Sequence, residues 1–495
     1  MNRCSRFASL LVVSLSALGL FSAGPAPAAE LGRVAFVNSG SEEAQEPFQQ
    51  GVAALHSFFY DEAADLFREA QRRDPGFAMA YWGEALTHNH PLWRQQDRDA
   101  ALEALGKLAP TRQERAAKAP TERERAYLET VEILYGDGEK HERDVAYREA
   151  LRRLAERFPD DPEARALHAL AIQGAAETAH QTGGADVIPA RMESAGILEE
   201  LFDRHPDHPG VLHYLIHAYD DPVHAPLGLR PARIYAEVAP EANHALHMPS
   251  HIFLQLGMWE RVVASNEDAV AASEAWVERR GHARDKIDLH SLSWLHYARL
   301  QLGQTEAAER SLAKARQVAE EVGSARAVST RDWMAARHLV ELHATEPPVG
   351  LPAADETEVG DWPLVSAAAL AAWRRGDREA LSELAARLRA LAENDESTGA
   401  LAAAARQAEG LALLAAGQRD EAVAALEEAV EIEEHMGPPS GPPDPLQPSH
   451  ELLGEVLLQL GRPAEAREAF RAALERTPNR TWSVKGLAAA EKGAG

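Results

Sequence analysis

The chain has 495 residues, of which 45% are apolar and 26% are charged, so its composition is that of a globular protein rather than a disordered one. At about 150 residues per domain, this length predicts roughly three domains or one elongated array. Lys and Arg number 51 against 77 Asp and Glu, which gives a net charge of −26. No basic patch offsets this acidity, so repulsion from phosphates excludes nucleic acids as expected partners.

Residues 1–29 have the parts of a secretory signal peptide. Arg3 and Arg6 precede an apolar run over residues 7–21, and a segment of small residues follows it. We therefore expect the protein to be exported, to the periplasm or outside the cell; a retained membrane anchor is the alternative. The single cysteine, Cys4, precedes the apolar run, so the mature chain has neither disulfides nor thiolate ligands. It also has no later run of about 18 apolar residues, so we expect no membrane span.

The remainder predicts one helix after another, because Ala, Leu, Glu and Arg dominate and apolar residues recur at spacings of three and four. One pattern of small and large residues returns along the chain. It is seen first in Ala63, Phe67, Ala70 and Pro75. Its other copies are Gly303, Ala308, Leu312 and Ala315, then Gly410, Gly417, Ala422, Leu426 and Ala429, and finally Gly454, Gly461, Ala466, Phe470, Ala473 and Pro478.

This pattern resembles the tetratricopeptide repeat, an antiparallel helix pair with a period of 34 residues. The resemblance implies an all-α fold, a right-handed α-solenoid in which stacked pairs share one core and form a concave groove. Such a groove implies a protein or peptide partner. The stretches 80–85, 213–218, 247–252 and 450–455 also resemble an exported bacterial subgroup of these proteins with histidine-rich central repeats. That second resemblance implies a fold and no particular activity.

The predicted organisation has six parts. The signal peptide is followed by repeats at 30–110, divergent helical pairs at 111–208, histidine-rich repeats at 209–345, a divergent pair at 346–400 and C-terminal repeats at 401–495. Two proline-rich segments, 347–360 and 437–448, are expected to be loops because they cannot continue a helix.

Histidine is concentrated in one part of the chain, where residues 205–251 hold eight of the 21 histidines. His213 and His217 form a pair four residues apart, as do His247 and His251, and side chains at that spacing share one helix face. The second pair follows the first by 34 residues, which is one repeat period. Four imidazoles are therefore expected on adjacent helices about 8–10 Å apart, facing one groove.

His244 and Asp220 fall at neighbouring groove positions of the same two repeats, so we include them as further candidate ligands. Histidine nitrogens suit Zn, Cu or Ni, and an acid such as Asp220 shifts the preference toward Zn or Fe. By contrast, His88, His90, His205 and His208 stand in sequence contexts typical of loops and turns.

The sequence thus predicts an exported helical-repeat protein that binds a metal ion or a small polar ligand through the candidate ligands His213, His217, His244, His247, His251 and Asp220. Three alternatives stay open: a structural hydrogen-bond network, a scaffold for a protein or peptide partner, and an enzyme that uses histidine as a general base without metal. Phosphate-binding loops, dinucleotide fingerprints and nucleophilic-serine motifs are absent from the sequence, so whether the protein is an enzyme stays open.

Overall fold

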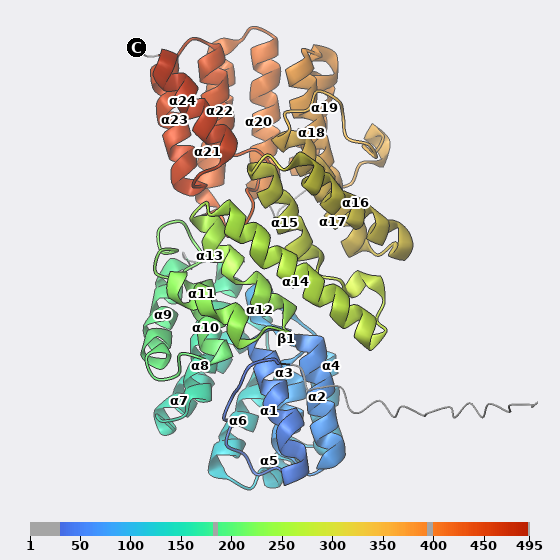
Figure 1. Cartoon of the computed structure of the whole chain (residues 1–495), viewed down its shortest axis with the longest axis vertical. Coiled ribbons are helices and arrows are strands. Elements are labelled where there is room, and N and C mark those ends of the chain that lie inside the picture. The colour runs from blue at the N-terminus through green and yellow to red at the C-terminus, as the bar shows by residue number, and fades with distance from the viewer. Residues whose placement is uncertain (1–29, 182–186, 394–398, 494–495) are drawn as a thin grey trace, which may run out of the picture.

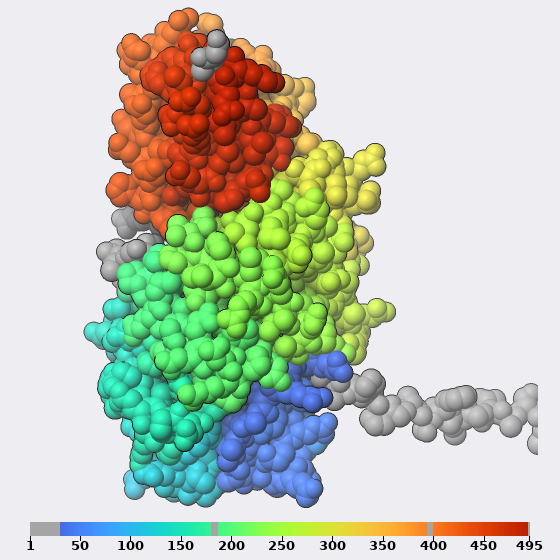
Figure 2. All heavy atoms as spheres, turned by 60° about the vertical axis from the view of Figure 1, so that its left-hand side comes forward, coloured from blue at the N-terminus to red at the C-terminus, as the bar shows by residue number. Residues whose placement is uncertain are grey.

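The computed structural model describes residues 30–181, 187–393 and 399–493, and the predicted signal peptide lies outside them. Helices follow one another along an elongated body, with the N-terminal part at one end and the C-terminal part at the other (Figures 1 and 2). The only strands among the described residues are β1 (Asn89–His90) and β2 (Gln95–Gln96), which form a small antiparallel hairpin. The prediction of an all-α helical solenoid is therefore confirmed.

The N-terminal part packs by fitting large side chains against glycines. The Phe67 ring lies so close to Gly51 and Gly83 that a Cβ on these glycines would come within 2.9 Å and 2.3 Å of it. This close packing of large on small residues joins each helix to its neighbours. The elements are α1 (Glu42–His56), α2 (Tyr60–Arg73), α3 (Ala78–Leu86), η1 (Pro91–Trp93), α4 (Arg98–Leu108), α5 (Arg112–Lys118), α6 (Glu122–Leu134), α7 (Lys140–Arg157), α8 (Pro162–Gln181) and α9 (Ile188–Phe202).

The central part carries the candidate site. Its elements are α10 (Pro209–Ala218), α11 (Leu229–Val238), α12 (Asn243–His247), α13 (Pro249–Gln255), α14 (Trp259–Arg280), η2 (Arg284–Lys286), α15 (Leu289–Gln301) and α16 (Thr305–Val322). Pro249 begins α13 directly after α12, as expected of a proline at the first turn of a helix. At 22 residues, α14 is long, and with the η2 turn it delays the start of α15.

The C-terminal part repeats the packing of the first, because the Phe470 ring lies against Gly454 and Gly486. Its elements are α17 (Ala325–Glu341), η3 (Ala354–Glu356), η4 (Val359–Asp361), α18 (Trp362–Arg375), α19 (Arg378–Glu393), α20 (Gly399–Ala415), α21 (Arg419–His435), α22 (Ser449–Gln459), α23 (Pro463–Arg476) and α24 (Thr481–Gly493). As predicted, neither 347–360 nor 437–448 contains an α-helix.

The chain closes on itself at both ends of the central part. At the N-terminal side α1 contacts α10, and Glu62 of α2 accepts hydrogen bonds from Trp276 and Arg280 of α14. At the C-terminal side the buried Arg480 donates to the hydroxyl of Tyr297 in α15, and Trp259 of α14 donates to the backbone oxygen of Asn479. His213, which the sequence analysis expects to face an open groove, is buried against α1 and donates to the backbone oxygen of His56.

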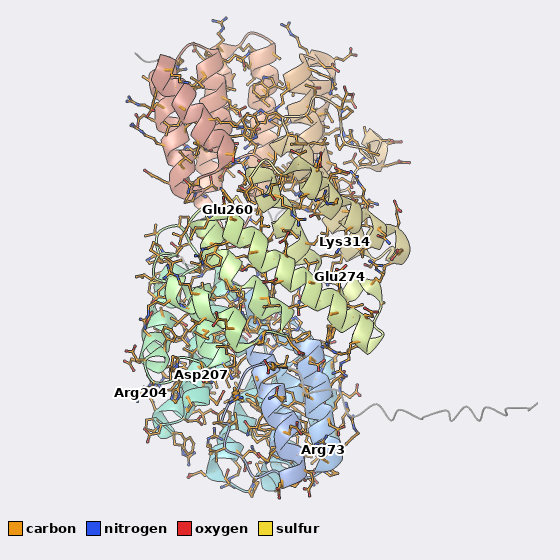
Figure 3. All side chains as sticks on the ribbon, in the orientation of Figure 1. Arg73, Arg204, Asp207, Glu260, Glu274 and Lys314 are labelled. Atoms are coloured by element: carbon orange, nitrogen blue, oxygen red, sulfur yellow. The ribbon has the colours of Figure 1, made fainter. Side chains whose placement is uncertain are left out.

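Two hydrophobic cores fill the described part of the molecule. One runs from Leu31 to Met334 and the other from Ala336 to Ala490, so they meet inside α17. Charged side chains cover the outside, as in the ion pair of Lys314 with Glu274 (Figure 3). Among the described residues, no helix combines the length and apolarity needed to cross a lipid bilayer.

Candidate metal centre

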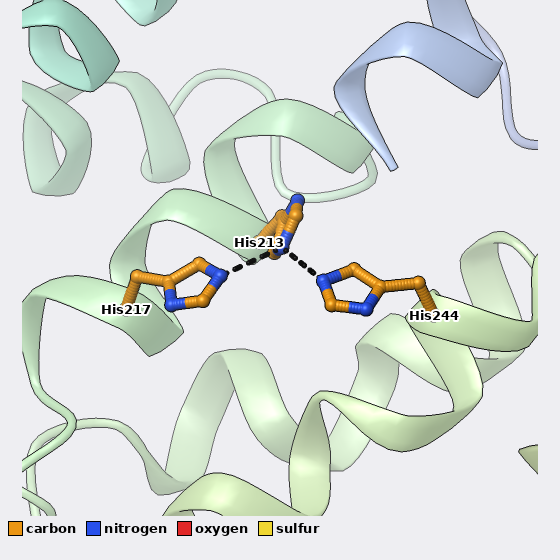
Figure 4. A group of neighbouring side chains, drawn as sticks. All are labelled: His213, His217 and His244. Carbon is orange, nitrogen blue, oxygen red and sulfur yellow. Dashed lines mark hydrogen bonds between the residues drawn. The ribbon is translucent and has the colours of Figure 1, made fainter. Parts of the chain in front are cut away.

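Six histidine side chains from the central part form two adjacent groups. The first centre is His213, His217 and His244, shown in Figure 4, and the second centre is His247, His251 and His290. Within each group, one ring nitrogen from every histidine lies within 4.8 Å of the others. In the first centre, His213 and His217 lie on α10 and His244 lies on α12. In the second centre, His247 ends α12, His251 lies on α13 and His290 lies on α15.

In the first centre, three Nε2 atoms converge. The Nε2 of His213 lies 3.0 Å from that of His217 and 3.2 Å from that of His244. The Nδ1 of His213 donates to the backbone oxygen of His56 at 2.7 Å, so the Nε2 of the neutral ring carries a lone pair. That one lone pair faces two other ring nitrogens and cannot form a good hydrogen bond with both.

In the second centre, the Nε2 atoms of His247 and His251 lie 3.1 Å apart. Both Nδ1 atoms donate away from this contact: His247 donates to Asn266 Oδ1 at 2.6 Å and His251 donates to Asp220 Oδ2 at 2.6 Å. The orientation of Asn266 is fixed, because its amide nitrogen donates to the backbone oxygen of Val262. When both rings are neutral, two Nε2 lone pairs therefore face each other with no proton between them.

The spacing of the ring nitrogens in both centres suits a transition-metal ion. Nitrogen ligands at 2.0–2.1 Å from a tetrahedral zinc ion lie about 3.3 Å from one another, close to the spacings in both centres. The oxygen acceptors behind His213, His247 and His251 orient the rings so that Nε2 is the free ligand atom, as partners behind metal-bound histidines do.

Burial disfavours protonation of His247 in the second centre and of all three histidines in the first. Burial lowers the pKa of His247 well below its usual value, and the neighbouring His290 and His251 lower it further. In the first centre, burial lowers the pKa of His213 to about 3 and holds those of His217 and His244 well below the usual range. The rings of His213, His217, His244 and His247 are therefore neutral near pH 7, which is the form that binds metal.

Aromatic side chains enclose both centres. The Phe58 ring lies 4.3 Å from that of His213 and stacks on His217 and His244. The Trp294 ring lies 4.9 Å from His247 and 4.4 Å from His251. These rings shield the imidazoles from water on one side and fix their orientation.

A third group, His56, Glu163 and His208, differs because its hydrogen bonds are complete. Both histidines donate from Nε2 to Glu163, at 2.6 Å and 3.1 Å. Their Nδ1 atoms are hydrogen-bonded as well, to the hydroxyl of Tyr214 and to the amide of Val211, which donates to His208. This group is a structural network, and it holds α10 against α1 and α8.

Asp220 lies behind His251 rather than among the converging nitrogens. Its second oxygen accepts from Gln255, so both carboxylate oxygens are engaged. The four histidines that the sequence analysis assigns to one site lie in two centres that touch, since the rings of His217 and His251 are 5.6 Å apart and those of His244 and His247 are 5.9 Å apart.

The sequence analysis did not single out His290. It follows His244 by 46 residues, and the same 46 residues separate Gly257 from Gly303, two glycines with positive φ that follow α13 and α15. His290 is therefore the counterpart of His244 in the next repeat, displaced because α14 is long. Aligning the chain on those glycines would have found it.

Stacked antiparallel helices with histidine centres between them define an α-helical repeat protein. Residues 403–435 and 448–480 each match the tetratricopeptide repeat. These two segments, both in the C-terminal part of the chain, are therefore tetratricopeptide repeats. No curated protein sequence matches the chain.

Solved structures of low identity are similar to it. The Cut9–Hcn1 structure of the APC/C hetero-tetramer gives a chain of 13% identity, with 92% of this chain and 78% of that chain covered and a TM-score of 0.35. Yeast Tom70 is 10% identical, with coverage of 92% and 96% and a TM-score of 0.32. A thermophilic TPR protein of Thermus thermophilus is 19% identical, with coverage of 49% and 99% and a TM-score of 0.24.

Proposed function

We propose that the protein binds transition-metal ions at both centres. The observation that carries this proposal is the pair of Nε2 atoms of His247 and His251, 3.1 Å apart, whose rings both donate from Nδ1 elsewhere. A cation between them removes the repulsion of the two lone pairs. The first centre repeats the arrangement with three converging nitrogens.

Three protein ligands leave a further coordination position for water or for a small molecule, which is the construction of a catalytic rather than a structural zinc site. Imidazole ligands suit Zn and Cu, and Fe sites usually add a carboxylate ligand. Since Asp220 is engaged behind His251, Zn and Cu are the metals that we favour over Fe.

Titration of the metal-free protein tests this proposal. Protein purified without a histidine tag is stripped with a chelator, titrated with Zn²⁺ or Cu²⁺, and analysed for metal after gel filtration. We expect two ions per chain. Retention of less than one ion per chain contradicts the proposal and leaves the histidines as a hydrogen-bond network.

A protein or peptide partner is the second candidate function, favoured by the two matched repeats at 403–435 and 448–480. Helical repeats present extended surfaces to such partners. The two functions are compatible, and a chain that retains no metal in the titration would leave partner binding as the proposal.

We propose in addition that the protein acts after export, on the basis of the basic, apolar and small-residue order of residues 1–29. Intact mass of the recovered protein tests this: the mature chain should begin at Ala29 or Glu30. A chain that begins at Met1 contradicts export by this signal.

A further inference from the structure

A cavity of about 810 Å³ opens beside the second centre. His290 and Trp294 of α15 form one wall, α17 forms another, and the proline-rich loop 437–444 closes the far side. Gly441 of this loop lies against Trp294, since a Cβ there would come within 2.9 Å of the indole. The volume falls in the usual range for sites that bind small organic molecules.

The cavity has an excess of positive charge in a strongly acidic chain. Its lining includes four arginines, Arg94, Arg326, Arg337 and Arg476, against two acids, Glu433 and Asp444. The burial of Glu433 raises its pKa, and burial raises the pKa of Asp444 to about 6. The two acids thus offset only part of the arginine charge, and the local field favours an anion.

The main evidence for an anion site is the incomplete hydrogen bonding of the buried Arg337 side chain. Its side chain is 7% exposed, its Nη2 donates to the backbone oxygen of Pro443 at 2.6 Å, and its Nη1 has no hydrogen-bond partner. No carboxylate of the described residues lies within 4 Å of it. A buried guanidinium without a counter-ion is strongly unfavourable unless something else pairs with it.

Arg480, which is also buried, shows how this chain satisfies a guanidinium by itself. It donates to Glu341 at 2.6 Å and to both oxygens of Glu451 at 2.9 Å. Arg476 lies at the same cavity as Arg337 and is likewise incompletely paired, because its Nε has no hydrogen-bond partner and lies 3.7 Å from Glu433 Oε1. Two donors at one cavity therefore lack an acceptor.

We propose that this cavity binds the oxyanion group of a small organic ligand, a carboxylate or a phosphate, with Arg337 as its main donor. The rest of the ligand lies beside Trp294 and reaches toward His290, so that a metal ion in the second centre would be its neighbour. The guanidinium of Arg337 contacts the Pro443 carbonyl and the Tyr297 ring but no carboxylate, whether or not a metal is bound. The inference therefore stands independently of metal binding.

Binding of two anionic probes to metal-free protein tests the inference. Succinate and glycerol 3-phosphate are titrated while tryptophan fluorescence and the melting temperature are followed, with neutral succinamide as the control ligand. We expect at least one anion to bind saturably, raising the melting temperature, and succinamide not to bind. The anion with the higher affinity identifies the carboxylate or the phosphate as the natural group.

Variants of the cavity arginines test whether the anion binds in this cavity. Arg337→Gln should lower the affinity for the anion at least tenfold, and Arg476→Gln should lower it less. Arg310→Gln, at an exposed position of α16, should leave the affinity unchanged. The inference is overturned if neither anion binds at millimolar concentration, or if Arg337→Gln binds as tightly as the wild type. The two proposals can be told apart. If the protein retains less than one zinc ion per chain but binds an anion in a way that depends on Arg337, the metal proposal is rejected and the anion site in the cavity is supported.

Discussion

The Nδ1 of His251 donates to Asp220 Oδ2 at 2.6 Å, and this bond determines which ring nitrogen faces the second centre. The other oxygen of the carboxylate accepts from Gln255 at 3.1 Å. Asp220 thus holds the ring and its tautomer from behind, while the Nε2 stays available to a metal.

Asp220→Asn should weaken metal binding by about 10–100-fold, the usual effect of losing a partner behind a ligand. An amide has one acceptor oxygen, so it cannot accept from both His251 and Gln255. Zinc affinity measured against a chromophoric chelator checks this. Asp207→Asn, at an exposed position (Figure 3), is the control and should bind zinc like the wild type; equal affinity in both variants contradicts the role of Asp220.

Replacing His290 tests whether the two centres bind metal independently of each other. His290→Ala removes one of three ligands of the second centre and none of the first, so the expected metal content falls from two ions per chain toward one. His217→Ala should do the same through the first centre. His435→Ala, at an exposed position far along the chain, is the control. Metal contents that are the same in all three variants would exclude two separate centres.

Metal binding should resist mild acid. Three histidines with an ordinary pKa near 6.5 would lose about a thousandfold in affinity between pH 7.5 and 5.5, because protons compete for each ring. The lowered pKa of His213, about 3, and those of His217 and His244, well below the usual range, predict a loss of less than tenfold in the first centre. The zinc affinity of the first centre is measured at both pH values in the His290→Ala variant, in which the first centre keeps all three ligands. A thousandfold loss of affinity contradicts the prediction.

The same shifts make the stability of the metal-free protein depend on pH. Below pH 6.5 these histidines bind protons in the unfolded chain and not in the folded one, so the stabilisation is complete above 6.5 and falls as the pH decreases toward the folded pKa. Across that pH window, each of these buried histidines lowers the free energy of unfolding by about 1.4 kcal/mol for every unit that the pH falls. Urea unfolding at pH 7 and 5 checks the sign, and equal stability at both would contradict it.

Glycine-to-alanine changes should have opposite effects at two helical positions. A Cβ at Gly83 would lie 2.3 Å from the Phe67 ring, so Gly83→Ala should destabilise the protein by about 1–3 kcal/mol through overpacking. Gly106, in α4, has open space around it, and Gly106→Ala should stabilise by about 0.5–1 kcal/mol. Thermal unfolding compares the two, and a tolerated Gly83→Ala would contradict the packing.

The sequence predicted the helical repeats well because packing imposes them locally. A small residue opposite a large one every 34 residues, such as Gly454 with Phe470, is visible without any structure. The paired histidines were visible for the same reason, since the i, i+4 spacing fixes a common helix face. Metal binding itself stays a prediction.

Contacts that depend on how the solenoid closes could not be predicted. His56 reaches His213 across 157 residues, and no periodicity connects α1 with α10. The role of Asp220 as a partner of His251, rather than a ligand, depends on which oxygen faces which ring, which spacing does not specify. His290 was missed because α14 and η2 break the 34-residue period.

The helix α17 has a mechanical consequence. It carries Met334, the last residue of one core, and Ala336, the first of the other, within a single uninterrupted helix. Two bodies joined by a linker can swing freely, but here any rotation of the C-terminal repeats would have to bend a helix whose hydrogen bonds resist bending. A displacement of the C-terminal repeats would therefore move α17 as a rigid body, and α17 would pass that movement to α15 and to the wall of the second centre.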